Sequence, residues 1–130
     1  MANIPMGTVH EETLLVTSEV AINFLKVEEA RVLSTPHMIG HMERTCRNAV
    51  LPHLDPGHDT VGTHVDVYHL APSPIGAIVT FRAEITAADG KRITFRVEAR
   101  SGEEKIGEGT HERAIVNVAR FAARVSEKRG

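Results

Sequence analysis

The stretch TPHMIGHMERTCRNAVL, residues 35–51, decides the fold of this 130-residue chain. Thr35 before Pro36 is typical of a helix start, because Thr can cap the first free N–H groups and Pro is favoured at the first helical position. At about 100° per residue, the apolar side chains fall within an arc of roughly 120°. They are Met38, Ile39, Met42, Cys46, Ala49 and Val50. The stretch therefore predicts one long helix, ended by Pro52, that buries a single face.

Strand patterns surround this helix. We expect five strands, at residues 8–17, 60–70, 77–86, 92–100 and 105–118. The last three form a meander, whose first turn carries Asp89-Gly90, a pair suited to tight hairpins. Residues 21–34 fit a short helix, a strand or a flap equally well. Residues 119–130 predict a short charged helix or tail.

The strand patterns also predict how the sheet packs. In residues 77–86 the apolar side chains alternate with polar ones, so the sheet buries one side only. The economical packing is a curved antiparallel sheet of about five strands wrapped around the long helix, an α+β hot-dog domain over residues 1–130. Since such a sheet leaves an exposed edge, we expect a homodimer or a higher homo-oligomer.

Composition excludes several classes of protein. A net charge of −2 gives no electrostatic reason to expect nucleic acid. No apolar run approaches the roughly 18 residues of a membrane span, and the N-terminus lacks the layout of a secretory signal. The single cysteine, Cys46, fits a reducing compartment. We therefore expect a cytoplasmic protein with neither a nucleic-acid nor a membrane partner.

Glu43 is the first candidate for chemistry. It lies just outside the apolar arc, beside Met42 and Cys46 in projection. A carboxylate at the rim of a buried face is partly desolvated, which makes it a better base. The simpler alternative is an ion pair with Arg47, one helical turn further on.

The helix start is the second candidate. Thr35 needs no role beyond capping, yet a helix start also presents N–H groups and a positive dipole potential. Because Pro36 has no N–H, the donors for an oxyanion would come from His37 or Met38.

His69 is the third candidate. It shares one face of its predicted strand with Val65 and Val67, and we expect this apolar face to point inward. An inward imidazole near a polar loop can serve as an acid or a base. The alternative is a core histidine bonded to a backbone carbonyl.

Other patterns suggest less chemistry. His37 and His41 stand four residues apart on the polar helix face, but zinc sites use three or four protein ligands, so we expect no metal. Gly107 and Gly109 suggest that another group approaches the sheet closely. Arg113 lies in the last expected strand, and we expect it to pair with a carboxylate on a neighbouring strand. No cofactor-binding motif occurs.

Three segments taken together resemble the fluoroacetyl-CoA thioesterase family of hot-dog proteins. They are TPHMIGHME at residues 35–43, the strand at residues 61–69, and GEGTHER at residues 107–113. The similarity runs from about Thr35 to Val125, and GEGTHER is its most specific part. The resemblance implies hydrolysis of a short-chain or small substituted acyl-CoA to the free acid and coenzyme A, without a cofactor.

The resemblance also implies roles for particular residues. Thr35, Glu43 and His69 correspond to the catalytic set of the family. Gly62 and Arg113 correspond to residues that help hold the acyl group. In this interpretation Glu43 attacks the thioester carbonyl or activates water, His69 supplies acid/base catalysis, and Thr35 orients the reacting group.

Two features depart from the family pattern. The fluoro-selective member has phenylalanines in the flap before the central helix, whereas residues 26–32 here are KVEEARV, and Phe24 is the flap's only aromatic residue. Pro36 also stands where a Gly would be expected. We therefore predict that fluoroacetyl-CoA is not strongly preferred over acetyl-CoA.

Two other functions stay open. A hot-dog enoyl-CoA hydratase would use an Asp–His pair, for which Asp59 and His64 are available. A non-catalytic acyl-CoA binding or sensing protein would keep the pocket and lose the acid/base set. The basic C-terminus offers Arg120 or Arg124 as a contact for the phosphates of coenzyme A, and the alternative is a solvated tail.

Overall fold

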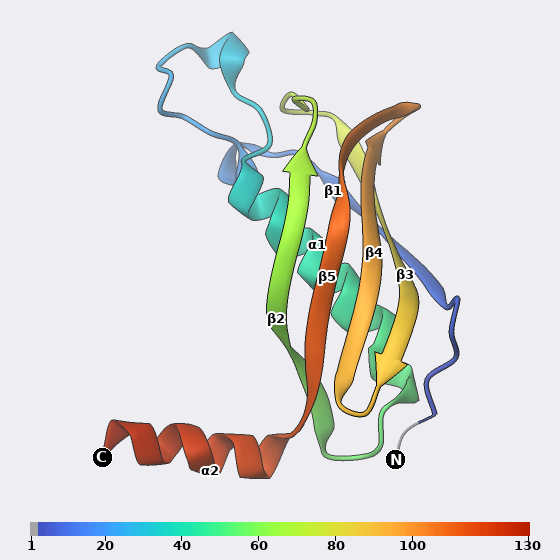
Figure 1. The fold of residues 1–130 in the computed structure, drawn as a ribbon. Helices are drawn as coiled ribbons and strands as arrows, with labels where there is room; N and C mark the ends of the chain where they lie inside the picture. Colours follow the sequence, from blue (N-terminus) through green and yellow to red (C-terminus); the bar gives the residue numbers. More distant parts are fainter. Residues whose placement is uncertain (1–2) are drawn as a thin grey trace.

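Five antiparallel strands form one curved sheet in the computed structural model, which describes residues 3–130 (Figure 1). The strands are β1 (Val9–Leu15), β2 (His58–His69), β3 (Ile78–Asp89), β4 (Arg92–Ser101) and β5 (Glu104–Asn117). Their order across the sheet is β1-β3-β4-β5-β2, so β3, β4 and β5 form the predicted meander. Strands β1 and β2 are the two edges.

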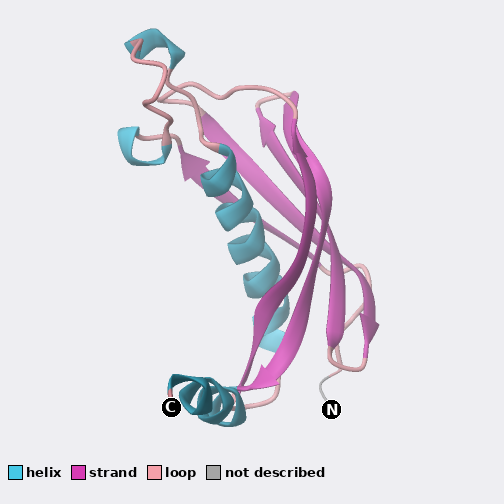
Figure 2. Cartoon of the chain, turned by 60° about the vertical axis from the view of Figure 1, so that its left-hand side comes forward, coloured by secondary structure: helices cyan, strands magenta, loops and turns pink. Residues whose placement is uncertain are grey.

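Helix α1 (Thr35–Val50) lies along one face of the sheet, and the sheet curves around it (Figure 2). The core fills the space between them. Met38, Met42 and Cys46 from α1 are buried against Phe81 and Phe95 from the sheet. Each such side chain contributes about 1.5–3 kcal/mol when fully removed from water. The predicted α+β arrangement is therefore the observed one.

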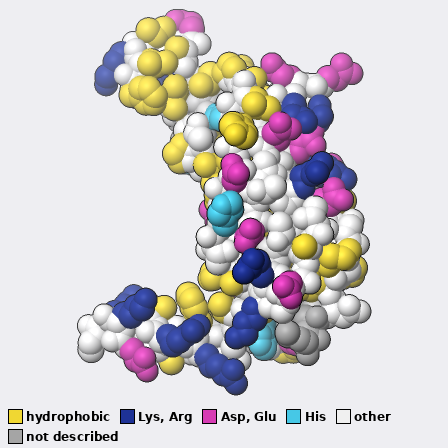
Figure 3. Space-filling model, viewed as in Figure 1, with side chains coloured by type: hydrophobic (Ala, Val, Ile, Leu, Met, Phe, Trp, Pro, Cys, Tyr) yellow, Lys and Arg dark blue, Asp and Glu magenta, His cyan; other side chains and the backbone are white. Residues whose placement is uncertain are grey.

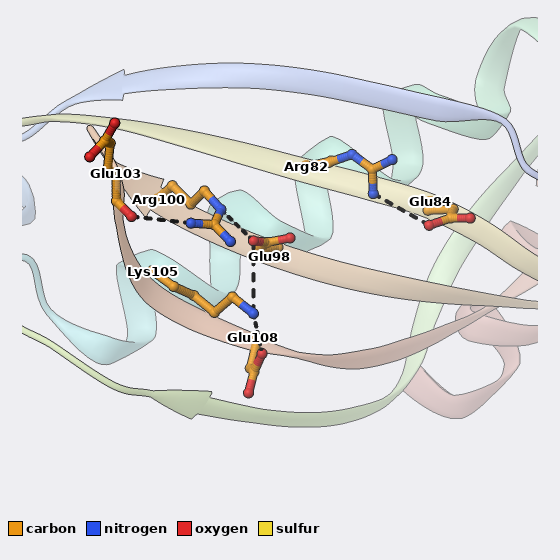
Figure 4. A network of polar contacts seen from close by, with 7 residues as sticks. All are labelled: Arg82, Glu84, Glu98, Arg100, Glu103, Lys105 and Glu108. Atoms are coloured by element: carbon orange, nitrogen blue, oxygen red, sulfur yellow. Dashed lines mark hydrogen bonds and ion pairs between the residues drawn. The ribbon is translucent and has the colours of Figure 1, made fainter.

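The opposite face of the sheet is polar (Figure 4). Within β5, Lys105 Nζ lies 2.8 Å from Glu108 Oε1, and within the adjacent β4, Arg100 pairs with Glu98. Exposed pairs of this kind contribute only about 0–1 kcal/mol each. Their presence shows that the sheet buries one side only, as the alternation predicted.

Two segments project from this body at opposite ends of β2 (Figure 1). Residues 18–34 form a flap with two single-turn helices, η1 (Ser18–Val20) and η2 (Glu28–Ala30), so the predicted segment 21–34 combines two of the three possibilities, a flap and a short helix. Helix α2 (Val118–Arg129) follows β5, and η3 (Leu51–His53) follows α1. None of the helices within residues 3–130 is long and apolar enough to cross a membrane.

Candidate active site

The start of α1 presents Thr35 to solvent, because Ser34 is the N-cap. Ser34 Oγ accepts a hydrogen bond from the His37 N–H at 3.1 Å, and its carbonyl accepts one from the Met38 N–H at 3.0 Å. The predicted cap at Thr35 was therefore one residue too late. The His37 and Met38 N–H groups both donate to Ser34 and the Met38 side chain lies in the core, so neither N–H is free to hold an oxyanion.

Thr35 is instead joined to His69, at the end of β2. Thr35 Oγ1 and His69 Nδ1 are hydrogen-bonded at 2.7 Å. The other ring nitrogen, Nε2, is buried and has no hydrogen-bond partner in the described part of the chain. Burial lowers the pKa of His69, so the ring is neutral at pH 7 and able to accept a proton.

An apolar pocket of about 320 Å³ adjoins this pair. Besides Thr35 and His69, the pocket is lined by side chains of the flap and of the loop after β2. These are Ile22, Phe24, Val32, Leu33, Leu70, Ala71 and Pro72. The unpartnered imidazole nitrogen thus belongs to a pocket in which little else is polar.

Glu43 lies further along α1, beside a different pair of residues. Its Oε2 is 3.7 Å from Arg113 Nη1 and 3.9 Å from His111 Nε2. Arg47 is bonded to Asp59 at 2.9 and 2.7 Å, so the ion pair considered for Glu43 and Arg47 is not formed. The Glu43 side chain is 40% exposed, so a substrate can reach it.

Arg113 is almost completely buried and is held on three sides. Its Nε donates to Thr60 Oγ1 at 2.7 Å and its Nη2 to the Thr60 carbonyl at 2.8 Å. Its Nη1 donates to His111 Nε2 at 3.2 Å. The carboxylate predicted as its partner is Glu43, which comes from α1 and not from a neighbouring strand.

His111 is the residue of this site that the sequence analysis missed. Its side chain is buried, and its Nδ1 donates to the His64 carbonyl at 2.7 Å. Because a carbonyl only accepts, the proton lies on Nδ1, and Nε2 is left to accept from Arg113. Burial lowers the pKa of His111, which favours this neutral form. Its position two residues before Arg113 was the available signal, since such residues share one strand face.

Gly62 gives the Glu43 carboxylate its space. A Cβ at this position would lie 2.5 Å from Glu43 Oε2 and 3.2 Å from His111 Cε1. The register of β2 against β5 shifts between Gly62 and His64, which is a bulge that adds one residue. Without the extra residue, Gly62 and His69 would point to opposite faces of the sheet, because they are seven positions apart.

The candidate residues therefore form two groups on one face. Thr35 and His69 lie at one end of β2, whereas Glu43, Gly62 and Arg113 lie towards its other end. At about 3.3 Å per residue, Gly62 and His69 are roughly 20 Å apart along the strand. Thr35, which is bonded to His69, lies eight positions before Glu43 on α1, or about 12 Å along the helix axis, so Glu43 and His69 of one chain lie too far apart to act on the same carbonyl carbon.

The other sequence motifs form no site. Asp59 is engaged by Arg47, and His64 is exposed, so the Asp–His pair of a hydratase is not assembled. His37 and His41 gain no third metal-binding neighbour among residues 3–130.

Comparison with known families decides between the remaining possibilities. The profile of the fluoroacetyl-CoA-specific thioesterases matches residues 16–119, a range that includes both groups of candidate residues. The chain belongs to this family. The fluoroacetyl-CoA thioesterase of Streptantibioticus cattleyicolor is 42% identical over 101 residues, which are 78% of this chain and 73% of that protein.

Solved structures agree with the family assignment. The fluoroacetyl-CoA thioesterase FlK matches with a TM-score of 0.88 and 34% identity, over 97% of this chain and 98% of that chain. A Thermus thermophilus member of the thioesterase superfamily matches with a TM-score of 0.87 and 32% identity, over 98% and 97% of the two chains. The predicted hot-dog fold and the predicted enzyme class, an acyl-CoA thioesterase, are confirmed.

Proposed function

We propose that this thioesterase hydrolyses a small acyl-CoA at a site that two copies of the chain build together. The observation that carries the proposal is the division of the candidate residues between two ends of β2. Family membership supports the reaction, and the division supports the two-copy architecture. The substrate is a short-chain or small substituted acyl-CoA, and the products are the free acid and coenzyme A.

The edge strand β2 provides the means of joining two copies. Its residues 62–66 are exposed, and their edge is unpaired. An antiparallel pairing of β2 with a second β2, about a two-fold axis between Val65 and Asp66, places Gly62 of one copy opposite His69 of the other. The same rotation repeats this meeting at the other end. A homodimer then holds two complete sites, and a single chain holds none.

In the composite site the reaction divides between the two groups. The Glu43 carboxylate attacks the thioester carbon or removes a proton from the attacking water. The neutral His69 of the second copy takes up a proton released by the attacking water and passes it to the sulfur as the C–S bond breaks, and its hydrogen bond with Thr35 fixes the ring. Overall, water supplies OH to the acyl carbon and H to the thiol.

A different N–H takes the oxyanion role first assigned to His37 or Met38. The backbone N–H of Thr35 opens α1 and donates no hydrogen bond within the described residues. It lies at the positive end of the helix dipole, where negative charge is stabilised. One such donor accelerates acyl transfer by on the order of 10²–10³-fold.

The surroundings of Glu43 favour a small acyl group. Even a Cβ at Gly62 would collide with the carboxylate, and the buried Arg113 closes the same side. A long acyl chain lacks room here, whereas a two-carbon group with a polar substituent could meet the guanidinium. The buried free thiol of Cys46 and a coenzyme A substrate support a cytoplasmic location.

Mixing two inactive variants tests the composite site. In a dimer of one Glu43→Gln chain and one His69→Ala chain, one of the two sites has both intact groups. Equal mixing and refolding should restore about a quarter of wild-type turnover, because half of the dimers are mixed and each has one active site. Release of free thiol from acetyl-CoA measures this turnover.

The matched control mixes Glu43→Gln with the double variant Glu43→Gln/His69→Ala, a combination that contains no intact site. Recovery in the first mixture and none in the second supports the proposal. No recovery in either mixture, with both variants folded, would refute it. A wild-type dimer that binds acyl-CoA without releasing thiol would favour the binding protein instead.

A further inference from the structure

We propose that helix α2 of one copy docks onto the flap of the second copy and holds it over Thr35 and His69. The inference rests on the two-copy site proposed above. It assigns one occupant to the uncovered apolar face of α2, namely the flap tip with Phe24, Leu25 and Val27.

The apolar face of α2 is turned away from its own sheet. No residue of α2 is buried. On the side towards β5, Arg120 and Arg124 line a hollow of about 600 Å³. On the other side, an arc of about 100° carries the apolar side chains Val118, Phe121, Ala122 and Val125. Val118 is 49% exposed and Val125 38%, Ala122 is exposed and Phe121 is partly buried, so its own chain covers this arc only in part.

The flap tip is a second uncovered apolar surface. Phe24 is 71% exposed, Leu25 53% and Val27 51%. Between Leu25 and Val27, Lys26 has a φ of 61°, in the left-handed region that costs a side-chain-bearing residue roughly 1–2 kcal/mol. The backbone thus adopts a costly conformation while presenting apolar side chains to water, which is typical of a contact surface.

The two surfaces lie at opposite ends of the same edge strand. Helix α2 follows Asn117, which pairs with His58 at the start of β2. The base of the flap, at Val32, bridges to Pro74 just beyond the end of β2. Figures 1 and 3 show both segments projecting from the same side of the body, as two lobes with an open space between them.

The two-fold axis that completes the active site also joins these lobes. When Gly62 of one copy faces His69 of the other, the same register places His58 of one copy level with Ser73 of the other. Helix α2 of the first copy then begins beside the flap base of the second. Because both lobes extend across the shared edge, they meet in the dimer.

Charge as well as apolarity matches across this contact. Helix α2 carries four basic residues and one acidic residue, and Figure 3 shows Lys and Arg side chains along its lobe. At about 100° per residue, Lys128 lies at the edge of the apolar arc and Arg129 at its C-terminal end. The flap tip continues from Val27 into Glu28 and Glu29, both exposed. An apolar centre with opposite charges at its rim is the usual composition of a protein interface.

Docking would act directly on the site. Phe24 and Ile22 of the flap line the pocket that contains His69. A flap held down by α2 covers that pocket and excludes water around the reacting thioester. A helix of one copy thereby regulates access to the acid/base group of the other.

Disulfide trapping tests the contact. In the variant Phe24→Cys/Val125→Cys, mild oxidation should produce a covalent dimer on a non-reducing gel, since a disulfide needs Cα atoms within about 7 Å. The matched control is Phe24→Cys/Glu127→Cys, in which the second thiol lies on the far side of α2. The native Cys46 is fully buried and is present in both variants, so it affects both in the same way. Each single-cysteine chain shows whether like segments pair with each other.

Oligomeric state under reducing conditions separates this inference from the proposed function. A non-covalent dimer that gives covalent dimer only in the Val125→Cys pair supports docking. A non-covalent dimer without any cross-link overturns docking and leaves the composite site intact. The same holds if the Glu127→Cys control, or the Val125→Cys chain alone, cross-links as well as the Val125→Cys pair. A monomer overturns both.

A charge exchange keeps the inference testable if the cysteine variants do not fold. Lys128→Glu/Arg129→Glu should raise KM for acyl-CoA several-fold, and adding Glu28→Lys/Glu29→Lys to the same chain should restore it. Equal KM values in all three proteins would also overturn docking.

Discussion

The two ends of β2 hold their functional groups in opposite ways. At the Gly62 end, Arg113 makes three hydrogen bonds, its neighbour His111 is buried, and only the Glu43 carboxylate reaches solvent. At the His69 end, a single hydrogen bond joins the ring to an exposed Thr35, and the flap above it is open to water. One end is fixed by its own chain, and the other is left for a partner to complete.

This difference follows from the chemistry of each end. A buried guanidinium must have its donors satisfied and a carboxylate near it, so Arg113 requires a rigid core around it. A proton-transfer group needs only correct placement and a pocket that excludes water. We therefore expect substitutions at the Gly62 end to alter turnover and pH-dependent stability, and substitutions beyond the His69 end to alter mainly substrate binding and selectivity.

The largest expected effect is that of Glu43→Gln. Gln keeps the shape of the side chain but can act neither as nucleophile nor as base, so kcat should fall by on the order of 10²–10⁴-fold. KM should change little, because the lost interaction matters only in the transition state. Thiol release from acetyl-CoA, together with a melting curve, measures both parameters and the fold.

The control for this substitution is Glu112→Gln. Glu112 lies next to Arg113 on β5 and pairs loosely with Arg92 at 3.9 Å, on the outer face of the sheet. It should retain full activity. A fully active Glu43→Gln protein would remove Glu43 from the mechanism.

The second effect in size is that of Gly62→Ala. The added Cβ would lie 2.5 Å from Glu43 Oε2, so the flexible carboxylate must move. A displacement of about 1 Å in a catalytic group can cost on the order of 10²-fold in rate. Stability should hold, since the carboxylate can turn towards solvent. Gly40→Ala is the matched control, because a Cβ at that position in α1 meets nothing within 4 Å.

Gly40→Ala should stabilise the protein by about 0.4–1 kcal/mol without loss of turnover. If the two alanine variants had equal activity, space for the carboxylate at Gly62 would not be a requirement. Steady-state kinetics and thermal melts of both variants give the comparison.

The fold could be predicted further than the site. The helix, the meander and the one-sided sheet follow from local periodicity, and His69 was expected to face inward from its strand. The cap was misplaced by one residue because both Ser34 and Thr35 are good capping residues, and only backbone geometry distinguishes them. The division of the site was hidden because it depends on distances along β2 and on a single bulge.

His111 should make the free energy of unfolding depend on pH. Burial lowers its pKa below the value of about 6.5 that it has when unfolded. The unfolded chain therefore binds the proton more readily, and the free energy of unfolding falls as the pH drops through about 6.5, until folded His111 is itself protonated. Above about pH 7 this contribution to stability is fully present.

His111→Gln should flatten the loss of melting temperature between pH 7 and pH 5. Part of the loss remains, because burial also lowers the pKa of His41 and His69. His64→Gln is the control, since the exposed His64 side chain takes no part and its carbonyl stays in place. A pH profile unchanged by His111→Gln would show that His111 is not the responsible group.

The open end of β2, at His69, should contribute only weakly to the selectivity between acyl-CoA substrates. The flap brings only one aromatic residue, Phe24, to the pocket beside His69. Without further aromatic side chains there, kcat/KM for fluoroacetyl-CoA should exceed that for acetyl-CoA by no more than about tenfold, or about 1.4 kcal/mol. A ratio in the thousands would mean that the Gly62 end alone selects fluorine, through the fixed Arg113.

The smallest expected effect concerns coenzyme A. Arg120 and Arg124 line a hollow of about 600 Å³ with Lys91. Phosphates held there would be paired with exposed side chains, so Arg120→Ala should raise KM for acetyl-CoA only about threefold at low salt, with kcat unchanged. The increase should shrink in high salt, because screening weakens exposed ion pairs. Arg96→Ala, on the outer face of the sheet, should leave KM unchanged at any salt. If Arg120→Ala behaves like this control, the phosphates bind elsewhere, and α2 serves the flap alone.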